Sequence, residues 1–326
     1  MVRKINPHLY SIKIRLPGSP LRDLNSYVIV TPNRNLLIDT GFNMPGCMND
    51  MLRGIKELDL DMSRTDFLIT HAHADHFGLV NKLAEPECQV FIGEMDVSLL
   101  RKEWGDGTYW LKVMAQFVKE GFPAGLIKNA LDMNPARALA GARPASLTPL
   151  KDGQLLTVGD IQLRCVHTPG HSPGHICLYN EIDKYMILGD HVLFDITPNI
   201  TTWPNMRNSL GKYLNSLRET MNYDVCLPLP AHRECHCTLA ERISQLLAHH
   251  DKRLNEIVEI IRKNPGSNAY DIAGNMEWLI KAKSWEYFPL AQKWFAIGEA
   301  LAHLYYLQEE SVIRSEMAGD TVVYFA

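Results

Sequence analysis

The sequence predicts an α/β fold in which stacked β-sheets are covered by helices. Three features of this chain of 326 residues lead to that expectation. Short β-rich runs alternate with helical stretches up to about residue 190, an alternation typical of layered sheets and helices. A mostly helical insertion interrupts the strands at about 96–148, and helical periodicity dominates after His232. We therefore expect a sheet-containing domain over residues 1–237 and a helical domain over residues 238–326.

The expected strands are short runs of aliphatic, aromatic and β-branched residues bounded by turn residues. The first two are separated by the turn sequence TPNR. The complete set of expected strands lies at 26–30, 35–39, 66–70, 88–93, 160–168, 175–180 and 185–190.

The insertion contains an amphipathic helix. Trp110, Val113, Met114 and Phe117 recur at the spacing of one helix face. This apolar stripe is expected to pack on the main domain, although a lid over a site could both pack and touch substrate. The aromatic side chains expected to wall a substrate pocket are Trp104, Tyr109, Trp110 and Phe117.

The last ninety residues predict three helices followed by a hairpin. The longest helix carries its apolar face from Ile243 to Ile261, and two more helices are expected at 269–276 and about 290–308. A hairpin should follow, with its turn near Gly319 and Asp320. Helices followed by a hairpin resemble a winged-helix module. Residues 238–326 carry nine Lys/Arg and twelve Asp/Glu, a net charge of −3. Because modules that read DNA usually have a basic face, a structural role is favoured.

The overall composition points to a cytoplasmic protein without membrane segments. We find no apolar run of membrane-spanning length and no signal peptide. Seven cysteines without framework spacing suit a reducing compartment. The net charge of −4 gives no general attraction to nucleic acid or to an anionic membrane.

The segment THAHADHFG, residues 70–78, is the most informative part of the sequence. It places His71, His73, Asp75 and His76 within six positions. Taken singly, Asp75 could cap a helix and His71 could simply end a strand. A protein core avoids such a cluster because each imidazole would need a hydrogen-bond partner. A bound metal ion explains the cluster better than either structural alternative.

Three further ligand candidates follow expected strands. His167 ends the strand 160–168, Asp190 ends the strand 185–190, and His232 follows the apolar run VCLPLPA. Loops that follow strands gather at one edge of a sheet, so these side chains could meet the histidine cluster. Each residue alone could equally be a capping histidine, a turn aspartate or a loop histidine.

The order IDTG, THAHADHFG, HTPGHSPGH, LGD and PAH resembles the metallo-β-lactamase superfamily. The resemblance covers about residues 8–310 and is strongest to glyoxalase II-like hydrolases with a winged-helix-like tail. It implies an αββα sandwich with two divalent metal ions at one edge, zinc in the first place and iron or manganese as alternatives. By position it assigns one metal to His71, His73 and His167. It assigns the second metal to Asp75, His76 and His232, with Asp190 bridging.

The resemblance also assigns supporting roles. Asp39 of IDTG matches a position that orients ligands, and His175 is expected to support the site or the fold. His171 and His191 are candidates for facing the substrate. The segment LPAHRECHC departs from the usual Pro-Gly-His-Gly, so His236 is a rival to His232. Cys235 and Cys237 are weaker candidates, because imidazole and carboxylate ligands already suffice for zinc.

Two cations bridged by a carboxylate can share a water and lower its pKa, which produces a hydroxide nucleophile near neutral pH. Asp75 could hold a metal and also transfer a proton. We expect a hydrolase of thioesters or related carboxylic esters and lactones. The insertion's net charge of +2, from seven Lys/Arg and five Asp/Glu, would suit an anionic small-molecule substrate such as an acyl-CoA.

Two alternatives stay open at this point. One is a metal-dependent phosphodiesterase or single-strand ribonuclease. The other is a non-enzymatic regulator that binds nucleic acid through its tail, which the acidic tail disfavours. Nucleic acid and membrane are not expected partners. The tail is expected either to support the sandwich or to form a homodimer contact.

Overall fold

Two β-sheets form the inner layers of the protein. The computed structural model describes residues 1–103, 107–142, 144, 146–280 and 282–326. Within these residues the first sheet has seven strands in the order β1 to β7 and the second has five in the order β12-β11-β10-β9-β8. The first sheet comprises β1 (Val2–Lys4), β2 (Leu9–Arg15), β3 (Asp23–Val30), β4 (Asn35–Ile38), β5 (Thr65–Ile69), β6 (Val90–Gly93) and β7 (Thr148–Leu150). The second comprises β8 (Leu155–Val158), β9 (Ile161–His167), β10 (Ile176–Asn180), β11 (Tyr185–Gly189) and β12 (Leu227–Pro230).

The alternation of side chains along the strands creates the layers. In β3, Val28 faces the outer side of the first sheet, while its neighbours Tyr27 and Ile29 face the second sheet. Successive side chains of a strand point to opposite faces, so each sheet can bury both of its faces. The space between the sheets is filled by aliphatic side chains from both, including Leu68 and Leu178.

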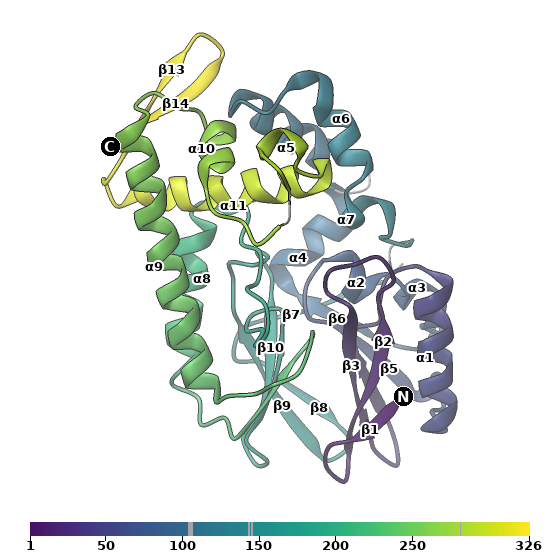
Figure 1. Ribbon diagram of the computed structural model, residues 1–326. Coiled ribbons are helices and arrows are strands. Elements are labelled where there is room, and N and C mark those ends of the chain that lie inside the picture. Colours follow the sequence, from purple (N-terminus) through teal and green to yellow (C-terminus); the bar gives the residue numbers. More distant parts are fainter. Residues whose placement is uncertain (104–106, 143, 145, 281) are drawn as a thin grey trace.

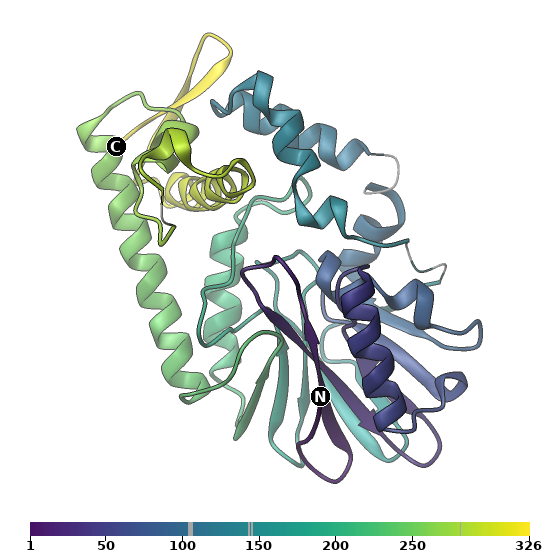
Figure 2. The ribbon, with the colours of Figure 1, turned by 45° about the vertical axis from the view of Figure 1, so that its right-hand side comes forward.

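Helices cover the two outer faces (Figures 1 and 2). Helix α1 (Pro45–Glu57) packs on β2, and α8 (Ser209–Thr220) packs on the second sheet through Leu210, Leu214 and Leu217. The result is the expected αββα sandwich. The sequence did not predict β1, β2, β8 or α1; α1 begins with Pro45, a favourable first helical residue. The short helices α2 (Ala74–Phe77), η1 (Met62–Arg64) and α3 (Val80–Leu83) occupy connections of the first sheet.

The insertion and most of the C-terminal region form one helical layer across one end of the sandwich, whereas the long C-terminal helix α9 (Leu239–Lys263) runs along its side next to α8 (Figures 1 and 2). The insertion contains α4 (Glu94–Ser98), η2 (Leu99–Glu103), α5 (Thr108–Lys119), α6 (Ala124–Asp132) and α7 (Pro135–Ala138). The C-terminal region contains α9 (Leu239–Lys263), α10 (Ala269–Asn275), η3 (Trp285–Tyr287), α11 (Leu290–Glu309), β13 (Arg314–Ala318) and β14 (Thr321–Phe325). The helices and the hairpin occur where the sequence places them, and their likeness to a winged helix stays a prediction.

The amphipathic stripe of α5 packs mainly against this C-terminal region. Phe117 lies 4.7 Å from Trp294 of α11, measured between ring centroids. Both residues belong to one hydrophobic cluster that also includes α9, α10 and the outer face of the second sheet. None of the described helices is long and apolar enough to cross a membrane.

A buried carboxylate joins the insertion to the hairpin. Glu120 accepts hydrogen bonds from the hydroxyl of Tyr305 on α11 at 3.1 Å and from that of Tyr324 on β14 at 2.9 Å. Burial raises the pKa of Glu120. Because burying such groups is favourable only when they are paired, these contacts fix how α5, α11 and β14 meet.

We expect Glu120→Ala to destabilise the protein by about 2–4 kcal/mol, because the hydroxyl hydrogens of two tyrosines would lose their acceptor. Urea denaturation measures this free energy. The exposed Glu310 at the end of α11 supplies a control, Glu310→Ala, which should stay within about 0.5 kcal/mol of wild type. Equal stabilities for the two variants would contradict the role assigned to Glu120.

Candidate metal centre

The site residues lie at one edge of the sandwich, where strands of both sheets end. His71 and His73 follow β5, and Asp75 and His76 lie on α2 directly after them. The other ligand candidates come from the second sheet. These are His171 between β9 and β10, Asp190 after β11 and His232 after β12. Strands β4 to β7 run parallel to each other, as do β11 and β12, so their carboxyl ends deliver these loops to a common edge.

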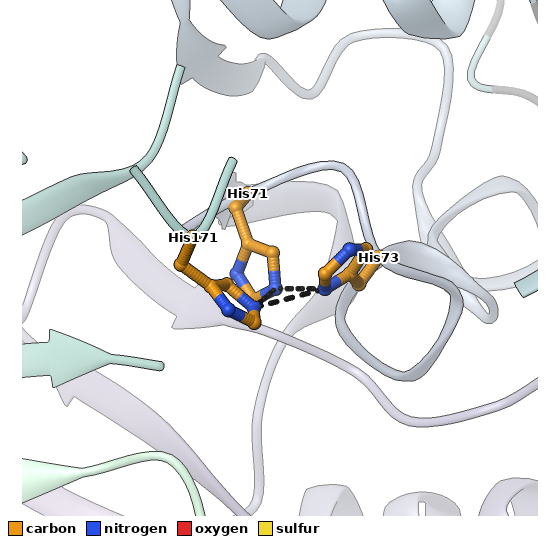
Figure 3. A group of neighbouring side chains, drawn as sticks. All are labelled: His71, His73 and His171. Carbon is orange, nitrogen blue, oxygen red and sulfur yellow. Dashed lines mark hydrogen bonds between the residues drawn. The ribbon is translucent and has the colours of Figure 1, made fainter. Parts of the chain in front are cut away.

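Three histidines form the first group, which we call the three-imidazole group: His71, His73 and His171. The Nε2 atom of His71 lies 2.9 Å from Nδ1 of His73 and 3.2 Å from Nε2 of His171. His73 Nδ1 and His171 Nε2 are 3.0 Å apart. Figure 3 shows these three nitrogens pointing toward one another.

The second group consists of Asp75, His76 and His232. The Oδ2 atom of Asp75 lies 3.3 Å from Nε2 of His232 and 3.7 Å from Nε2 of His76. Asp190 lies between the two groups. Its Oδ1 is 3.3 Å from His232 Nε2, and its Oδ2 is 3.6 Å from His171 Nε2. This is the arrangement required of a carboxylate that bridges two ions.

The outer hydrogen bonds of the imidazoles decide where their protons sit. The Nδ1 atoms of His171 and His232 face the backbone oxygens of Asn199 at 2.9 Å and Asp23 at 2.7 Å. A carbonyl oxygen can only accept, so each Nδ1 carries the proton and each neutral ring presents a bare lone pair at Nε2.

The same reasoning applies to His76, whose Nδ1 lies 2.8 Å from the Asp39 carboxylate. Its Nε2 therefore also presents a lone pair when the ring is neutral. Four buried atoms that face this space have no hydrogen-bond partner among the described residues. They are Asp75 Oδ2, Asp190 Oδ1, His76 Nε2 and His232 Nε2. Lone pairs and carboxylate oxygens that converge without a donor repel one another unless a cation lies between them.

The electrostatics agree with a site for cations. Burial lowers the pKa of His73 to about 3, and the neighbouring His171 adds to this, so the ring is neutral as a metal ligand must be. Burial also lowers the pKa values of His71 and His171.

The second group behaves differently because carboxylates surround it. Burial alone would lower the pKa of His76, but Asp39, Asp75 and Asp190 together raise it well above its usual value. The pKa of His232 is raised in the same way, against the effect of burial, by Asp190 and Asp75. A proton on these rings supplies the positive charge that the surrounding carboxylates favour. The residues present therefore fit two divalent cations.

Asp39 orients the histidine loop. Its Oδ1 accepts from the backbone N–H of Thr70 at 2.9 Å, and its Oδ2 accepts from the Thr70 hydroxyl at 2.8 Å and from His76. The Thr70 hydroxyl lies 3.1 Å from Nδ1 of His71. Since that hydroxyl donates to Asp39, it accepts from His71, which leaves the Nε2 atom of His71 free for a ligand bond.

Two further residues hold the ligand loops from behind. His175 stands 2.8 Å from the Thr168 hydroxyl, and its Nε2 accepts from the backbone N–H of Asp190 at 3.1 Å. Asp96 is fully buried and accepts from the N–H groups of Ala72 and Gly174. It thereby ties the histidine loop to the turn that carries His171. Sequence reasoning missed Asp96, because a single aspartate at the start of a helical stretch carries no signal of its own.

The structure brings His171, and not His167, to His71 and His73, so His171 replaces His167 as the proposed third ligand of the first group. The Nε2 atom of His167 lies 2.9 Å from the backbone oxygen of Pro173, so this ring is engaged within its own turn. His171, expected only to face a substrate, completes the three-imidazole group instead. Gly170, with φ of 140°, makes the bend possible, and a Cβ there would lie 2.4 Å from Cβ of Tyr213.

Several other candidates lie away from the metal centre. His191 is buried behind it, with Nε2 2.9 Å from the Thr220 hydroxyl. The side chains of Tyr109, Trp110 and Phe117 belong to the hydrophobic cluster of the helical layer. Within it Tyr109 lies next to Trp203, with ring centroids 6.1 Å apart, so its place in a pocket wall stays a prediction. The expected pocket residue Trp104 falls outside the described residues. Among the rival ligand candidates, His236 is exposed and pairs with Asp195, and Cys235 is also exposed.

A cavity of about 510 Å³ lies beside Trp203, and none of the ligand candidates is among the described residues that line it. It is bounded by α5, by the loop leading into α8, and by the end of α11. Trp203 links the cavity to the metal centre, because its ring stacks on His73 with centroids 5.8 Å apart. The charged side chains of its lining are Arg207 and Glu309.

Fold and site together define a metal-binding αββα sandwich. A sequence model described as the metallo-beta-lactamase superfamily matches residues 20–232. The chain belongs to this superfamily. A metallo-beta-lactamase family protein from Thermus thermophilus, known from a crystal structure, superposes with a TM-score of 0.81 at 25% identity, over 99% of both chains.

Two fungal relatives extend the comparison. Lactamase-like protein aptB of Emericella nidulans is 25% identical over 244 residues, which cover 75% of this chain and 62% of the relative. Atrochrysone carboxyl ACP thioesterase nsrC of Aspergillus novofumigatus is 25% identical over 263 residues, covering 80% of this chain and 65% of the relative. The chain thus matches less than two thirds of the length of either fungal protein.

The revised ligand leads to a direct test. We expect wild type to bind about two zinc ions per chain, and His171→Ala to lose about one of them because the three-imidazole group is broken. His167→Ala should bind as much zinc as wild type and so serves as the matched control. Elemental analysis after dialysis gives both stoichiometries. Loss of zinc from His167→Ala with retention by His171→Ala would restore the original assignment.

Proposed function

We propose that this protein is a dinuclear metal-dependent hydrolase that acts on thioesters. The observation that carries the proposal is the convergence of imidazole nitrogens on two buried carboxylates, Asp75 and Asp190, at atoms that have no hydrogen-bond partner among the described residues. The first metal would be held by the three-imidazole group and the second by Asp75, His76 and His232, with Asp190 shared. Zinc suits this set of nitrogen and oxygen ligands, and iron or manganese are alternatives.

When bound, such a pair of cations would supply a water of lowered pKa and a Lewis acid for the substrate's carbonyl oxygen. The chain's own residues would then orient the metal ligands and accept the proton. Burial alone would raise the pKa of Asp75, but His76 and His232 bring it below its usual value. Asp75 is therefore ionised, as a metal ligand must be, and it could accept a proton at the carboxylate oxygen that does not hold the metal. Asp39 and His175 keep His76 and Asp190 in place, so little reorganisation is needed during reaction.

A thioester is the substrate class whose hydrolysis needs the fewest catalytic groups. Its carbonyl is more electrophilic than that of an amide, and its thiolate leaving group is stable near neutral pH. A general acid for the leaving group is therefore unnecessary. The name of the Aspergillus relative, an acyl carrier protein thioesterase, agrees with this choice.

The cavity beside Trp203 is where we place the part of the substrate remote from the thioester. Arg207 lines this cavity and is exposed to solvent, so its guanidinium can pair with an anionic group of the substrate such as a phosphate. We therefore propose a small anionic acyl thioester as substrate.

The reaction itself can be tested by comparing an acyl-CoA with single-stranded RNA under one set of metal conditions. We expect faster hydrolysis of the thioester. His71→Ala and Asp75→Ala should each lower kcat/KM by roughly two to four powers of ten, since each removes a ligand and Asp75 also accepts the proton. The exposed histidine supplies a control, His236→Ala, which should keep wild-type activity. RNA cleavage that disappears in His71→Ala, with no thioester turnover, would favour a nuclease instead.

The role of Arg207 can be tested separately from the chemistry. We expect Arg207→Glu to raise KM for an acyl-CoA about tenfold through loss of an ion pair and added repulsion, with kcat nearly unchanged. KM for the same acyl group on uncharged N-acetylcysteamine should not change. Glu309→Arg is the matched charge reversal and should lower KM for the acyl-CoA. Equal KM changes for the charged and uncharged thioesters would show that Arg207 does not recognise an anion.

A further inference from the structure

The three-imidazole group is assembled from loops of both sheets. His71 and His73 lie on the loop that follows β5 of the first sheet, whereas His171 lies on the turn between β9 and β10 of the second sheet. Their facing nitrogens lie within 3.2 Å of one another (Figure 3). Nitrogens that bind a metal must be unprotonated, so they cannot hydrogen-bond to one another. Other contacts therefore have to hold the two loops at this spacing.

Asp96 in α4, the first helix of the insertion, is hydrogen-bonded to both loops. On the histidine loop, its Oδ2 atom accepts from the backbone N–H of Ala72 at 2.9 Å. Ala72 is the residue between His71 and His73 in the chain, so this bond fixes the backbone that joins the two ligands. The Asp96 side chain is fully buried, so water does not compete with its partners.

The other partners of Asp96 lie on the turn that carries His171. Its Oδ2 also accepts from the hydroxyl of Ser172 at 2.8 Å, and its Oδ1 accepts from the backbone N–H of Gly174 at 2.6 Å. Ser172 directly follows His171. The turn and α4 are in close contact, because a Cβ built on Gly174 would lie 2.3 Å from the backbone nitrogen of Asp96. One carboxylate thus joins the two loops through residues adjacent to all three imidazoles.

We propose that Asp96 is a positioning residue that sets the spacing of the three-imidazole group and thereby the affinity of the first metal site. The inference rests on the proposed metal centre and goes beyond it, because it gives the insertion a part in metal binding. Groups that hold metal ligands in place contribute to affinity although they do not touch the metal. A carboxylate that holds two ligand loops together acts in this way.

The second group of ligands has supports of its own. Nδ1 of His76 is held by Asp39, and Nδ1 of His232 faces the backbone oxygen of Asp23. None of the hydrogen bonds that Asp96 forms with described residues reaches this group. Loss of the Asp96 carboxylate should therefore weaken one metal site and spare the other.

The experiment measures zinc affinity by competition with a chromophoric chelator and records the visible absorption spectrum of the cobalt-substituted protein. We expect Asp96→Ala to weaken binding of one zinc ion about tenfold and to change the cobalt spectrum, while the other zinc ion binds as in wild type. Asp96→Asn should act in the same direction, because its NH2 group meets an N–H donor of one loop whichever way the amide is turned. Ser172→Ala keeps a hydrogen bond from Asp96 to each loop, so it should stay within about threefold of wild type.

Glu120→Ala is the matched control, because Glu120 is also a buried carboxylate of the insertion but its partners Tyr305 and Tyr324 belong to the C-terminal region. It should lower the temperature of thermal unfolding and leave zinc affinity and the cobalt spectrum unchanged. If Asp96→Ala does not fold, Asp96→Asn still tests the proposal, since it keeps the size of the side chain.

Wild-type zinc affinity and cobalt spectrum in the folded Asp96 variants would overturn the positioning role. An equal loss of zinc affinity in Glu120→Ala would do so as well, because the loss would then follow from lower stability alone. Absence of zinc binding by wild type would refute the proposed metal centre, and the role of Asp96 with it.

Discussion

The geometry of the site depends most on the hydrogen bonds that the Asp39 carboxylate accepts. Asp39 lies at the end of β4 in the left-handed region, with φ of 60°, a conformation that aspartate tolerates better than most residues. From there it holds Thr70 through backbone and hydroxyl and holds His76 through Nδ1. One buried group thus sets the start of the histidine loop, the tautomer of His76 and, through Thr70, that of His71. Because β4 and β5 are parallel neighbours, the sheet itself brings this carboxylate to the loop.

The helical layer covers the sandwich and also supports a loop beneath the proposed metal ligands. The insertion and the C-terminal region share one hydrophobic cluster with the outer face of the second sheet. Glu120 pins α5 to α11 and β14, while Gly298 allows α11 to pack against Thr201 of the loop beneath His171. The end of α11 also borders the cavity beside Trp203. The same helix therefore contacts both the proposed substrate cavity and the loop that orients a ligand.

Much of this arrangement could be predicted from the sequence, because strand patterns and the THAHADHFG segment are local signals. The strands of 26–30 and 66–70, the long helix after residue 238 and the terminal hairpin all occur where expected. His71, His73, Asp75, His76, Asp190 and His232 come together at one edge. The choice between His167 and His171 could not be made this way. It depends on the bend at Gly170, where the backbone lies too close to Tyr213 of α8 for any side chain, and Tyr213 is more than forty residues further along the chain. The role of Asp96 could not be predicted for the same reason, since its three hydrogen bonds reach two loops that are distant in sequence.

The packing of the C-terminal region also bears on what this part of the chain can bind. A nucleic-acid reader needs a helix face free to enter a groove and cations to meet phosphates. Here the apolar face of α9 is buried against the rest of the protein, and Arg253, one of its cations, is buried and committed to Glu256 and Glu299. A buried guanidinium that already pairs with two carboxylates cannot release counterions from a nucleic acid. Its charge acts inward, on the carboxylates of Glu256 and Glu299. The acidic net charge of the region and this inward use of its arginine both favour a structural role of the region over recognition of a polyanion.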